Sequence, residues 1–209
     1  MNNKVEVIPI AYSGMGKVGD FAWMQSQPGY ANTLFVFNDD EEQFDAFLNG
    51  QASGFTAGGG NAIARPWRKL DPVKSAGIPT GSLGRGYSVL DAKTQAKIDQ
   101  ALTIVGKLLK SFYFDRLVFS SNEDRSTLGI STYKVGEDVR KYIFDRLMQT
   151  PEEWQQFIDQ RVLQKFRQLT RAIEYAKRNG LPIDSSNAVV QQHRDEMRAI
   201  IRFRGNLNV

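Results

Sequence analysis

The sequence predicts an α/β fold in which a mostly parallel sheet is covered by helices on both faces and is followed by a helical extension. Short continuous apolar runs at residues 33–37 and 117–119 are typical of strands buried on both faces. Helical spacing of apolar residues over 98–112 separates the two runs, and such strand–helix alternation favours parallel pairing. Glycine-rich segments stand between these elements, where ligands of such folds bind near helix N-termini.

The first two expected strands lie in the first 40 residues. Residues 5–12 are rich in β-forming side chains and lead into a glycine-punctuated segment, residues 13–19. Residues 33–37 form the second strand. The polar residues 38–42 that follow are expected to form a solvated loop, with a helical turn at residues 45–48.

Gly58, Gly59 and Gly60 form the most unusual local feature of the sequence. Inside a helix each would cost about 1 kcal/mol relative to alanine, so the run indicates a tight turn or a close approach of the backbone. Residues 61–65 are expected to begin a helix that Pro66 limits. Residues 77–80 predict a short strand or a rigid turn, and residues 81–88 a second glycine-rich loop.

The next expected elements are a helix, a strand and a second helix. Asp91 has the character of an N-cap for the first helix. The strand at residues 117–119 leads into residues 120–132, a loop rich in hydroxyl groups. Apolar residues recur at helical spacing at Ile98, Leu102, Val105, Leu109 and Phe112 in the first helix, and at Val135, Val139, Ile143 and Leu147 in the second.

Residues 150–209 are expected to form a helical extension packed on an α/β domain of residues 1–149. Thr150, Pro151 and Glu153 together predict a helix start, with a threonine cap, proline at the first position and glutamate at the third. Gly180 followed by Pro182 predicts the end of that helix. A last helix is expected over residues 187–203.

The composition excludes several kinds of site. The chain of 209 residues has no cysteine, which excludes disulfides, cysteine-based zinc sites and a thiol nucleophile. His193 is its one histidine, which argues against a histidine metal site or a Ser-His-Asp triad. No apolar run has the length of a membrane span, so no membrane partner is expected. The lack of cysteine and of a signal-peptide run suits a cytoplasmic protein, and no cofactor is expected. The net charge of +4 permits an anionic partner without requiring one.

The glycine run is the first candidate for phosphate binding. Backbone N–H groups of Gly58, Gly59 and Gly60 would surround a phosphate or a ribose, because glycine lets the backbone come close to a ligand. A flexible loop or a packing turn is the alternative. The run matches neither a Walker A motif nor a Rossmann fingerprint.

Two further loops supply candidate ligand-binding side chains. Thr80, Ser82 and Arg85 would contact anionic oxygens, the alternative being a structural crossover with a solvated Arg85. The loop at residues 120–132 follows a strand and precedes a helix, which is a common geometry for holding phosphate; a polar surface loop is its alternative. The candidates in that loop are Thr127, Gly129, Ser131 and Thr132.

Two sets of charged or amide side chains are further candidates. Asn38 and Asp39 stand nearest the end of the second strand, where they would meet a ribose or act in acid–base chemistry if residues 38–42 are not simply solvated. Arg194, Arg198 and Arg202 recur every four residues on one face of the last helix. Such a stripe would contact nucleic-acid phosphates or an acidic partner, or would form a solvated helix face.

The order of motifs between residues 35 and 143 resembles that of the macrodomain-like class, an ADP-ribose-binding α/β fold found in phage and bacterial proteins. The motifs that carry the resemblance are FVFNDD at residues 35–40, GQA at residues 50–52, Asn61-Ala62, GIPT at residues 77–80, Asp91, and a strand followed by a Gly-Ile-Ser-Thr loop and a helix. The whole chain also resembles an accessory protein of T-even-type phages.

The resemblance implies a ligand of the ADP-ribose type and a role against bacterial ADP-ribosylating toxins or other host defences, in the host cytoplasm. The backbones of residues 58–60 and 127–132 would hold the phosphates, and Asn38, Asp39 or Asn61 would meet a ribose. If the protein is an enzyme it would hydrolyse an ADP-ribosyl bond, with Asn61 positioning water and Asp39 as the second catalytic candidate. A binder without catalysis is an equal alternative.

Two other classes of function remain open. The helical extension would bind and inhibit a host defence enzyme if the fold serves to present a surface. The arginines of the last helix would make the protein a nucleic-acid binder, with affinity falling steeply as salt rises.

Overall fold

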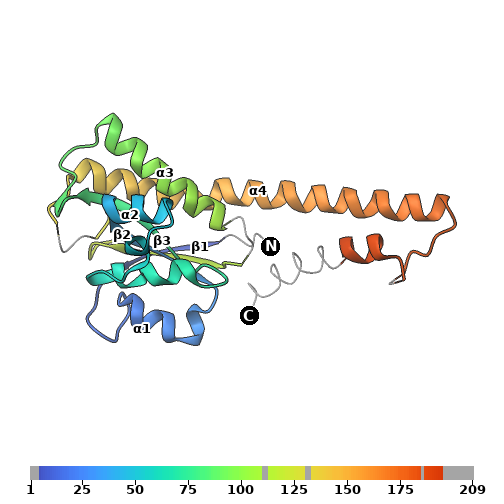
Figure 1. The fold of residues 1–209 in the computed structure, drawn as a ribbon, viewed down its shortest axis with the longest axis horizontal. Helices are drawn as coiled ribbons and strands as arrows, with labels where there is room; N and C mark the ends of the chain where they lie inside the picture. The colour runs from blue at the N-terminus through green and yellow to red at the C-terminus, as the bar shows by residue number, and fades with distance from the viewer. Residues whose placement is uncertain (1–4, 110–112, 130–132, 185, 195–209) are drawn as a thin grey trace. The chain divides into compact units, whose positions relative to one another are not determined.

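The computed structural model describes residues 5–109, 113–129, 133–184 and 186–194 (Figure 1). The chain divides into two compact units. We call Val5–Pro151 the sheet unit, and the residues from Glu152 onward belong to the helical unit. The sheet unit has the predicted α/β class, with a mostly parallel sheet of five strands.

The sheet brings the carboxyl ends of its parallel strands to one edge. The strands are β1 (Glu6–Ala11), β2 (Thr33–Asp40), β3 (Ser75–Ser82), β4 (Arg85–Gly86) and β5 (Arg116–Ser121). Their order is β1-β5-β2-β3-β4; the first four run parallel, and the short β4 pairs antiparallel with β3. Among the described strands, β1 pairs with β5 alone, so β1 forms one edge of the sheet and carries Pro9 near its middle.

Helices cover both faces of this sheet. In the described part of the sheet unit and onward to Arg178, the helices are α1 (Phe21–Ser26), η1 (Pro28–Tyr30), α2 (Glu41–Leu48), η2 (Ala52–Phe55), η3 (Gly60–Lys69), α3 (Ala92–Leu109) and α4 (Glu137–Arg178), where η marks the 3₁₀ type. Figure 1 shows α1 and η3 on one face, with α3 and the first turns of α4 on the other. The predicted cap of α3 is confirmed, since Asp91 Oδ1 accepts a hydrogen bond from the Thr94 amide at 2.7 Å.

The core on the α1 and η3 face is centred on Phe35 of β2. Its ring centroid lies 5.1 Å from that of Phe21, 5.4 Å from that of Trp67 and 6.3 Å from that of Tyr30, and Phe35 has no exposed surface. On the opposite face, Phe119 of β5 packs edge-to-face against Phe144 of α4. In β2 itself, residues 33–37 are all buried, as the continuous apolar run predicts.

The expected solvated loop at residues 38–42 is wrong. Strand β2 continues to Asp40, and α2 begins directly at Glu41. Asp40 is the N-cap of α2, and its Oδ1 accepts a hydrogen bond from the Glu42 amide at 3.2 Å. The strand can include the polar Asp39 because η3 supplies buried partners for its carboxylate. Those partners are distant in the sequence, so the local pattern of residues 38–42 does not reveal them.

The helix start expected at Thr150 is also wrong, because α4 runs without interruption from Glu137 to Arg178 and contains Pro151. Proline inside a helix removes one backbone hydrogen bond and costs about 3 kcal/mol. The remaining backbone hydrogen bonds of this helix of 42 residues offset that cost. The expected helix at residues 61–65 is η3, and it likewise continues through Pro66. The division between the two units falls directly after Pro151.

Within the helical unit, the predicted end of the long helix is confirmed. Gly180 has a positive φ of 64°, and the Leu181 amide donates to the Ala176 carbonyl at 2.8 Å, as in a glycine-terminated helix. A further helix covers residues 188–194, and the rest of the helix expected over 187–203 lies outside the described residues. None of the helices in the described ranges is long and apolar enough to span a bilayer.

Candidate functional site

A cavity of about 660 Å³ lies beside the carboxyl end of β5, within the sheet unit. The loop after β5, the segment before α4 and the first turn of α4 form its wall. Its lining residues are Ser88, Asn122, Ser126, Thr127, Lys134, Val135, Gly136, Glu137 and Arg140. We call this space the α4 cavity. Its position at the carboxyl edge of a parallel sheet is the place where ligands of open α/β folds bind.

Gly136 allows the segment before α4 to pack closely enough to form the cavity. A Cβ atom on this residue would collide with the backbone of Ser88. The Gly136 amide donates to the Tyr87 carbonyl at 2.8 Å, and its own carbonyl accepts from the Arg140 amide at 3.1 Å. The start of α4 is therefore held against the chain that follows β4.

The loop after β5 is ordered by its own side chains. Asn122 Oδ1 accepts hydrogen bonds from the amides of Ser126, at 2.9 Å, and Thr127, at 3.0 Å. Asp124 Oδ1 accepts from the Ser126 hydroxyl at 2.6 Å, and the bonds from Ser126 lower the pKa of Asp124. The hydroxyl-bearing wall of the cavity is therefore formed in advance of any ligand.

The charges that line the α4 cavity are two cations and one carboxylate. Lys134 is exposed, and the structure gives its amine no partner among the described residues. Arg140 donates from Nε to the Leu128 carbonyl at 3.0 Å and from Nη2 to Thr127 Oγ1 at 2.7 Å. Glu137 supplies the carboxylate at the first turn of α4. The N-terminus of α4 adds partial positive charge to this wall.

Of the candidates predicted in the loop at residues 120–132, Thr127 lines the cavity, whereas Gly129 is not one of its lining residues. Gly129 donates its amide to the Ser120 carbonyl at 3.0 Å, and its own carbonyl accepts from Asn38 Nδ2 at 2.7 Å. Asn38 is therefore engaged in joining β2 to this loop. Ser131 and Thr132 lie outside the described residues.

The predicted residue Asn61 joins three elements near the same edge of the sheet. Its Nδ2 donates to Ser120 Oγ at 2.6 Å, and its Oδ1 accepts from the Phe21 amide at 3.4 Å. Asn61 thus connects η3 to β5 and to the start of α1. Both ends of its amide therefore hold these elements together within the protein.

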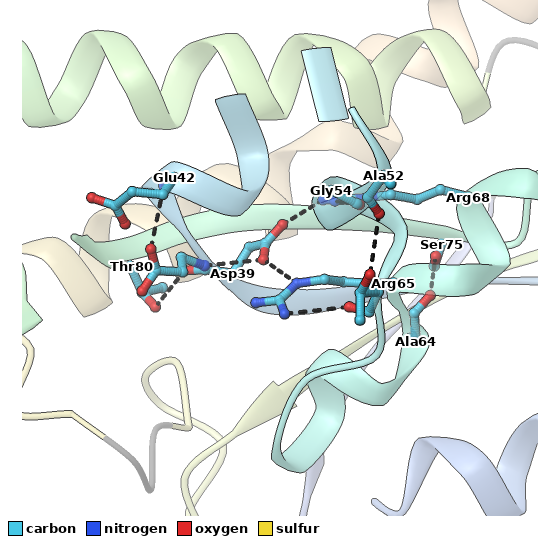
Figure 2. Close-up of polar contacts among 11 residues, drawn as sticks. Asp39, Glu42, Ala52, Gly54, Ala64, Arg65, Arg68, Ser75 and Thr80 are labelled. Carbon is cyan, nitrogen blue, oxygen red and sulfur yellow. Dashed lines mark hydrogen bonds and ion pairs between the residues drawn. The ribbon is translucent and has the colours of Figure 1, made fainter. Parts of the chain in front are cut away.

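Asp39 lies at the centre of a buried cluster that we call the Asp39 cluster, made of Asp39, Arg65 and Arg68 (Figure 2). Its Oδ1 lies 2.7 Å from Arg65 Nε, and its Oδ2 lies 2.5 Å from Arg68 Nη2. The Asp39 side chain has no exposed surface. Its carboxylate is therefore a partner of two guanidinium groups, enclosed away from solvent, rather than an accessible base.

Arg68 is the more deeply buried arginine of the cluster. Its side chain is 1% exposed, and its guanidinium lies 4.9 Å from the ring centroid of Phe37 and 4.3 Å from that of Phe47. Nη1 donates to the Gly54 carbonyl at 2.9 Å. Burial lowers the pKa of Arg68, while the charge of Asp39 opposes that shift. The two rings and the carbonyl replace part of the hydration that the buried guanidinium has lost.

The glycine run lies beside Arg65. The Gly58 amide donates to the Ala62 carbonyl at 3.0 Å, so it is engaged within the protein. A Cβ atom on Gly58 would come within 2.5 Å of Arg65 Nη1, whereas one on Gly59 or Gly60 would meet open space. Gly59 and Gly60 are exposed, and Gly60 has a positive φ of 54°. Gly58 therefore makes room for Arg65, and the next two glycines face solvent.

The candidate residues on the second glycine-rich loop lie in different environments. Thr80 is buried on β3, and its hydroxyl donates to the Asp39 carbonyl at 3.4 Å. Arg85 is exposed on β4. In the turn between these strands, Leu83 has a positive φ of 50°, and its amide donates to both carboxylate oxygens of Glu42 at 3.1 Å. Ser82 Oγ lies 2.6 Å from Glu42 Oε1.

Glu42 should stabilise this turn in a pH-dependent way. Burial would raise the pKa of Glu42, but the hydrogen bonds from Ser82 and Leu83 outweigh it and hold the pKa below its ordinary value. A lowered pKa contributes stability above the unfolded-state pKa, and this is lost as the pH falls through the folded-state value. We expect Glu42→Gln to cost less than about 1 kcal/mol at neutral pH, since the site is largely solvated.

Urea denaturation at neutral pH and near pH 3, where carboxylates are mostly protonated, measures this effect. The difference between Glu42→Gln and the original protein should be smaller at the acidic pH than at neutral pH. Glu123→Gln, an exposed neighbour of the α4 cavity, is the matched control and should have no effect at either pH. An equal loss for Glu42→Gln at both pH values would contradict the role given to the carboxylate.

Sequence reasoning missed the four cations that matter most in the described structure. Lys134 and Arg140 line the cavity, and Arg65 and Arg68 hold Asp39. The sequence signal for the second pair was its place, because both arginines follow shortly after the glycine run. Of the predicted arginine stripe, Arg194 lies in the helix at 188–194, and Arg198 and Arg202 fall outside the described residues.

Comparison with known proteins finds no matching family model, no matching curated protein and no matching solved structure. Among the described residues, no group of three or more His, Cys, Asp or Glu side chains is placed to hold a metal ion. A function for this chain therefore has to be argued from the α4 cavity and the charged groups around it.

Proposed function

We propose that the sheet unit binds a phosphate-bearing ligand of nucleotide size in the α4 cavity. The observation that carries the proposal is the combination of a cavity of about 660 Å³ with Lys134, Arg140 and the N-terminus of α4 in its wall. Cavities of roughly 300–1,000 Å³ are typical of small-molecule sites. A polar, cation-lined cavity of this size fits a nucleotide better than it fits an apolar ligand.

Each group in the wall has a distinct part in this proposal. Lys134 would pair with phosphate as a mobile point charge, because its amine is exposed and free to reach the ligand. The hydroxyls of Ser88 and Thr127 would donate to phosphate oxygens, whereas the Ser126 hydroxyl already donates to Asp124. Glu137 would accept a hydrogen bond from a ribose hydroxyl and would disfavour ligands of very high negative charge.

ADP-ribose is the first ligand to test, because the order of motifs resembles that of the macrodomain-like class. It carries two phosphates and two riboses, which match the cations, hydroxyls and carboxylate of the wall. Binding is favoured over hydrolysis, since Asn61 and Asp39 are both engaged within the protein. A protein of this kind would sequester or recognise ADP-ribose, in keeping with a phage protein that counters ADP-ribosylation.

Thermal denaturation with ADP-ribose, ADP and AMP tests the proposal. A ligand present at 100 times its dissociation constant should add about 2.7 kcal/mol to the stability of the protein. Lys134→Gln should weaken that ligand by about 10- to 100-fold, the effect of losing a hydrogen bond between two charged groups.

Lys107→Gln is the control for the loss of one positive charge, because Lys107 is exposed near the end of α3. The Lys107→Gln variant should bind the nucleotide with the same affinity as the original protein. If no nucleotide raises the melting temperature, or if both lysine variants bind equally well, the α4 cavity is not a phosphate site.

A further inference from the structure

The Asp39 cluster buries more positive charge than negative charge. Two guanidinium groups share one carboxylate, and Asp39 and Arg68 are almost completely enclosed. The neighbouring carboxylates have other partners: Asp40 caps α2, Glu41 accepts a hydrogen bond from the Tyr87 hydroxyl at 2.7 Å, and Glu42 holds the turn at Leu83. Within the described ranges, no second carboxylate pairs with Arg65 or Arg68, so one positive charge is left over.

The surplus charge reaches the surface through Arg65. Its side chain is 12% exposed, against 1% for Arg68. Nε of Arg65 is used by Asp39, whereas Nη1 makes a long contact of 3.5 Å to the Thr56 carbonyl. Nη2 has no hydrogen-bond partner among the described residues. Two of the three donor nitrogens of Arg65 therefore remain weakly used or unused, and they are held in place by the ion pair behind them.

Gly58, the first residue of the glycine run, lies next to these donors. Gly58 touches the position of Nη1 so closely that a Cβ atom there would collide with it. Gly59 and Gly60 follow in the sequence. Both are exposed, and a Cβ atom on either would meet open space. As the residues at the beginning of η3, they carry amides that an intrahelical hydrogen bond does not use.

We propose that Arg65, together with the backbone of Gly59 and Gly60, forms a second anion site that takes a tetrahedral oxyanion of the phosphate type. The guanidinium edge would bind two of its oxygens, and the glycine amides would donate to a third. The bound anion would balance the surplus charge of the Asp39 cluster. A carboxylate has two oxygens and cannot fill all three of these positions, so phosphate and sulfate should bind better than acetate.

This site is separate from the α4 cavity and does not depend on its proposed function. The two sites share no residue. Arg65 lies on η3, which covers one face of the sheet, whereas α4 lies on the other face (Figure 1). Each site can therefore be removed without the other.

Titration of the full-length, ¹⁵N-labelled protein with inorganic phosphate, followed by NMR at constant ionic strength, tests the second site. The amide signals of Gly59 and Gly60 should shift with phosphate and saturate, and acetate should shift them less. Arg65→Gln should raise the apparent dissociation constant at these two signals by about tenfold or more, as expected for the loss of a charged donor pair. Lys134→Gln should leave them unchanged, which distinguishes this site from the α4 cavity.

Two pairs of variants complete the test. Lys69→Gln removes the same charge from the same helix η3 and should bind phosphate as the original protein does. Gly58→Ala should weaken binding by displacing Arg65, whereas Gly59→Ala places its methyl group in open space at an allowed φ of −73° and should keep the fold. The proposal would be overturned if Arg65→Gln left the phosphate-induced shifts of the Gly59 and Gly60 signals unchanged. It would also be overturned if acetate shifted these signals as much as phosphate does.

Discussion

Asp39→Asn is expected to destabilise the sheet unit by about 3–5 kcal/mol, the cost of breaking a buried ion pair on one side. The substitution leaves Arg65 and Arg68 enclosed beside a neutral amide, with no carboxylate between them. Arg68 cannot move to water without leaving the rings of Phe37 and Phe47. Denaturation in urea, followed by circular dichroism, measures the loss.

Asp40→Asn is a matched control, because it removes the same charge from the next residue. Asparagine caps helices about as well as aspartate, so α2 should keep its N-cap and the stability should change by less than about 0.5 kcal/mol. Arg65→Gln should cost less than Asp39→Asn, since it leaves one arginine facing one carboxylate. A loss of under about 1 kcal/mol for Asp39→Asn would show that the cluster is not a buried ion pair in solution.

Phe35→Ala is expected to cost about 3–5 kcal/mol as well, through the cavity it would leave in the core. Phe35 is fully buried and makes ring contacts with Phe21, Tyr30 and Trp67. Those partners come from α1, η1 and η3, so the loss should loosen the whole layer of helices on that face. Thermal and urea denaturation both measure this effect.

Leu83→Ala is the control for the removal of a large apolar side chain, because Leu83 is 82% exposed. Its effect should stay within about 0.5 kcal/mol, as for most surface substitutions. Equal effects of the two substitutions would mean that β2 is not at the centre of the core.

The fold class was predictable because it depends on local patterns. The apolar run of β2, the spacing of apolar residues along α3 and the cap at Asp91 are all visible within a few neighbouring residues. The errors at residues 38–42 and at Thr150 have one common cause. In both places a locally plausible signal, a polar run or a capping sequence, was overridden by packing or by the continuity of a long helix.

The candidate sites were predictable in position but not in chemistry. The glycine run and the loop after β5 were expected near a ligand, and Thr127 does line the α4 cavity. The charged residues were missed because their partners lie far away in the sequence. Asp39 meets Arg65 and Arg68 after separations of 26 and 29 residues, and only the packing of η3 on β2 and β3 brings them together.

Pro9 has a consequence for self-association of the chain. The Glu6 amide of β1 donates to the Asp115 carbonyl, on the side of β5. Amides alternate between the two sides of a strand, so position 9 would direct its N–H away from β5, to the open edge. Proline has no N–H, and its ring obstructs a strand that approaches from that side. The sheet can keep every internal hydrogen bond of β1 while its outer edge resists the addition of strands from other molecules, which is the first step of aggregation in exposed sheets.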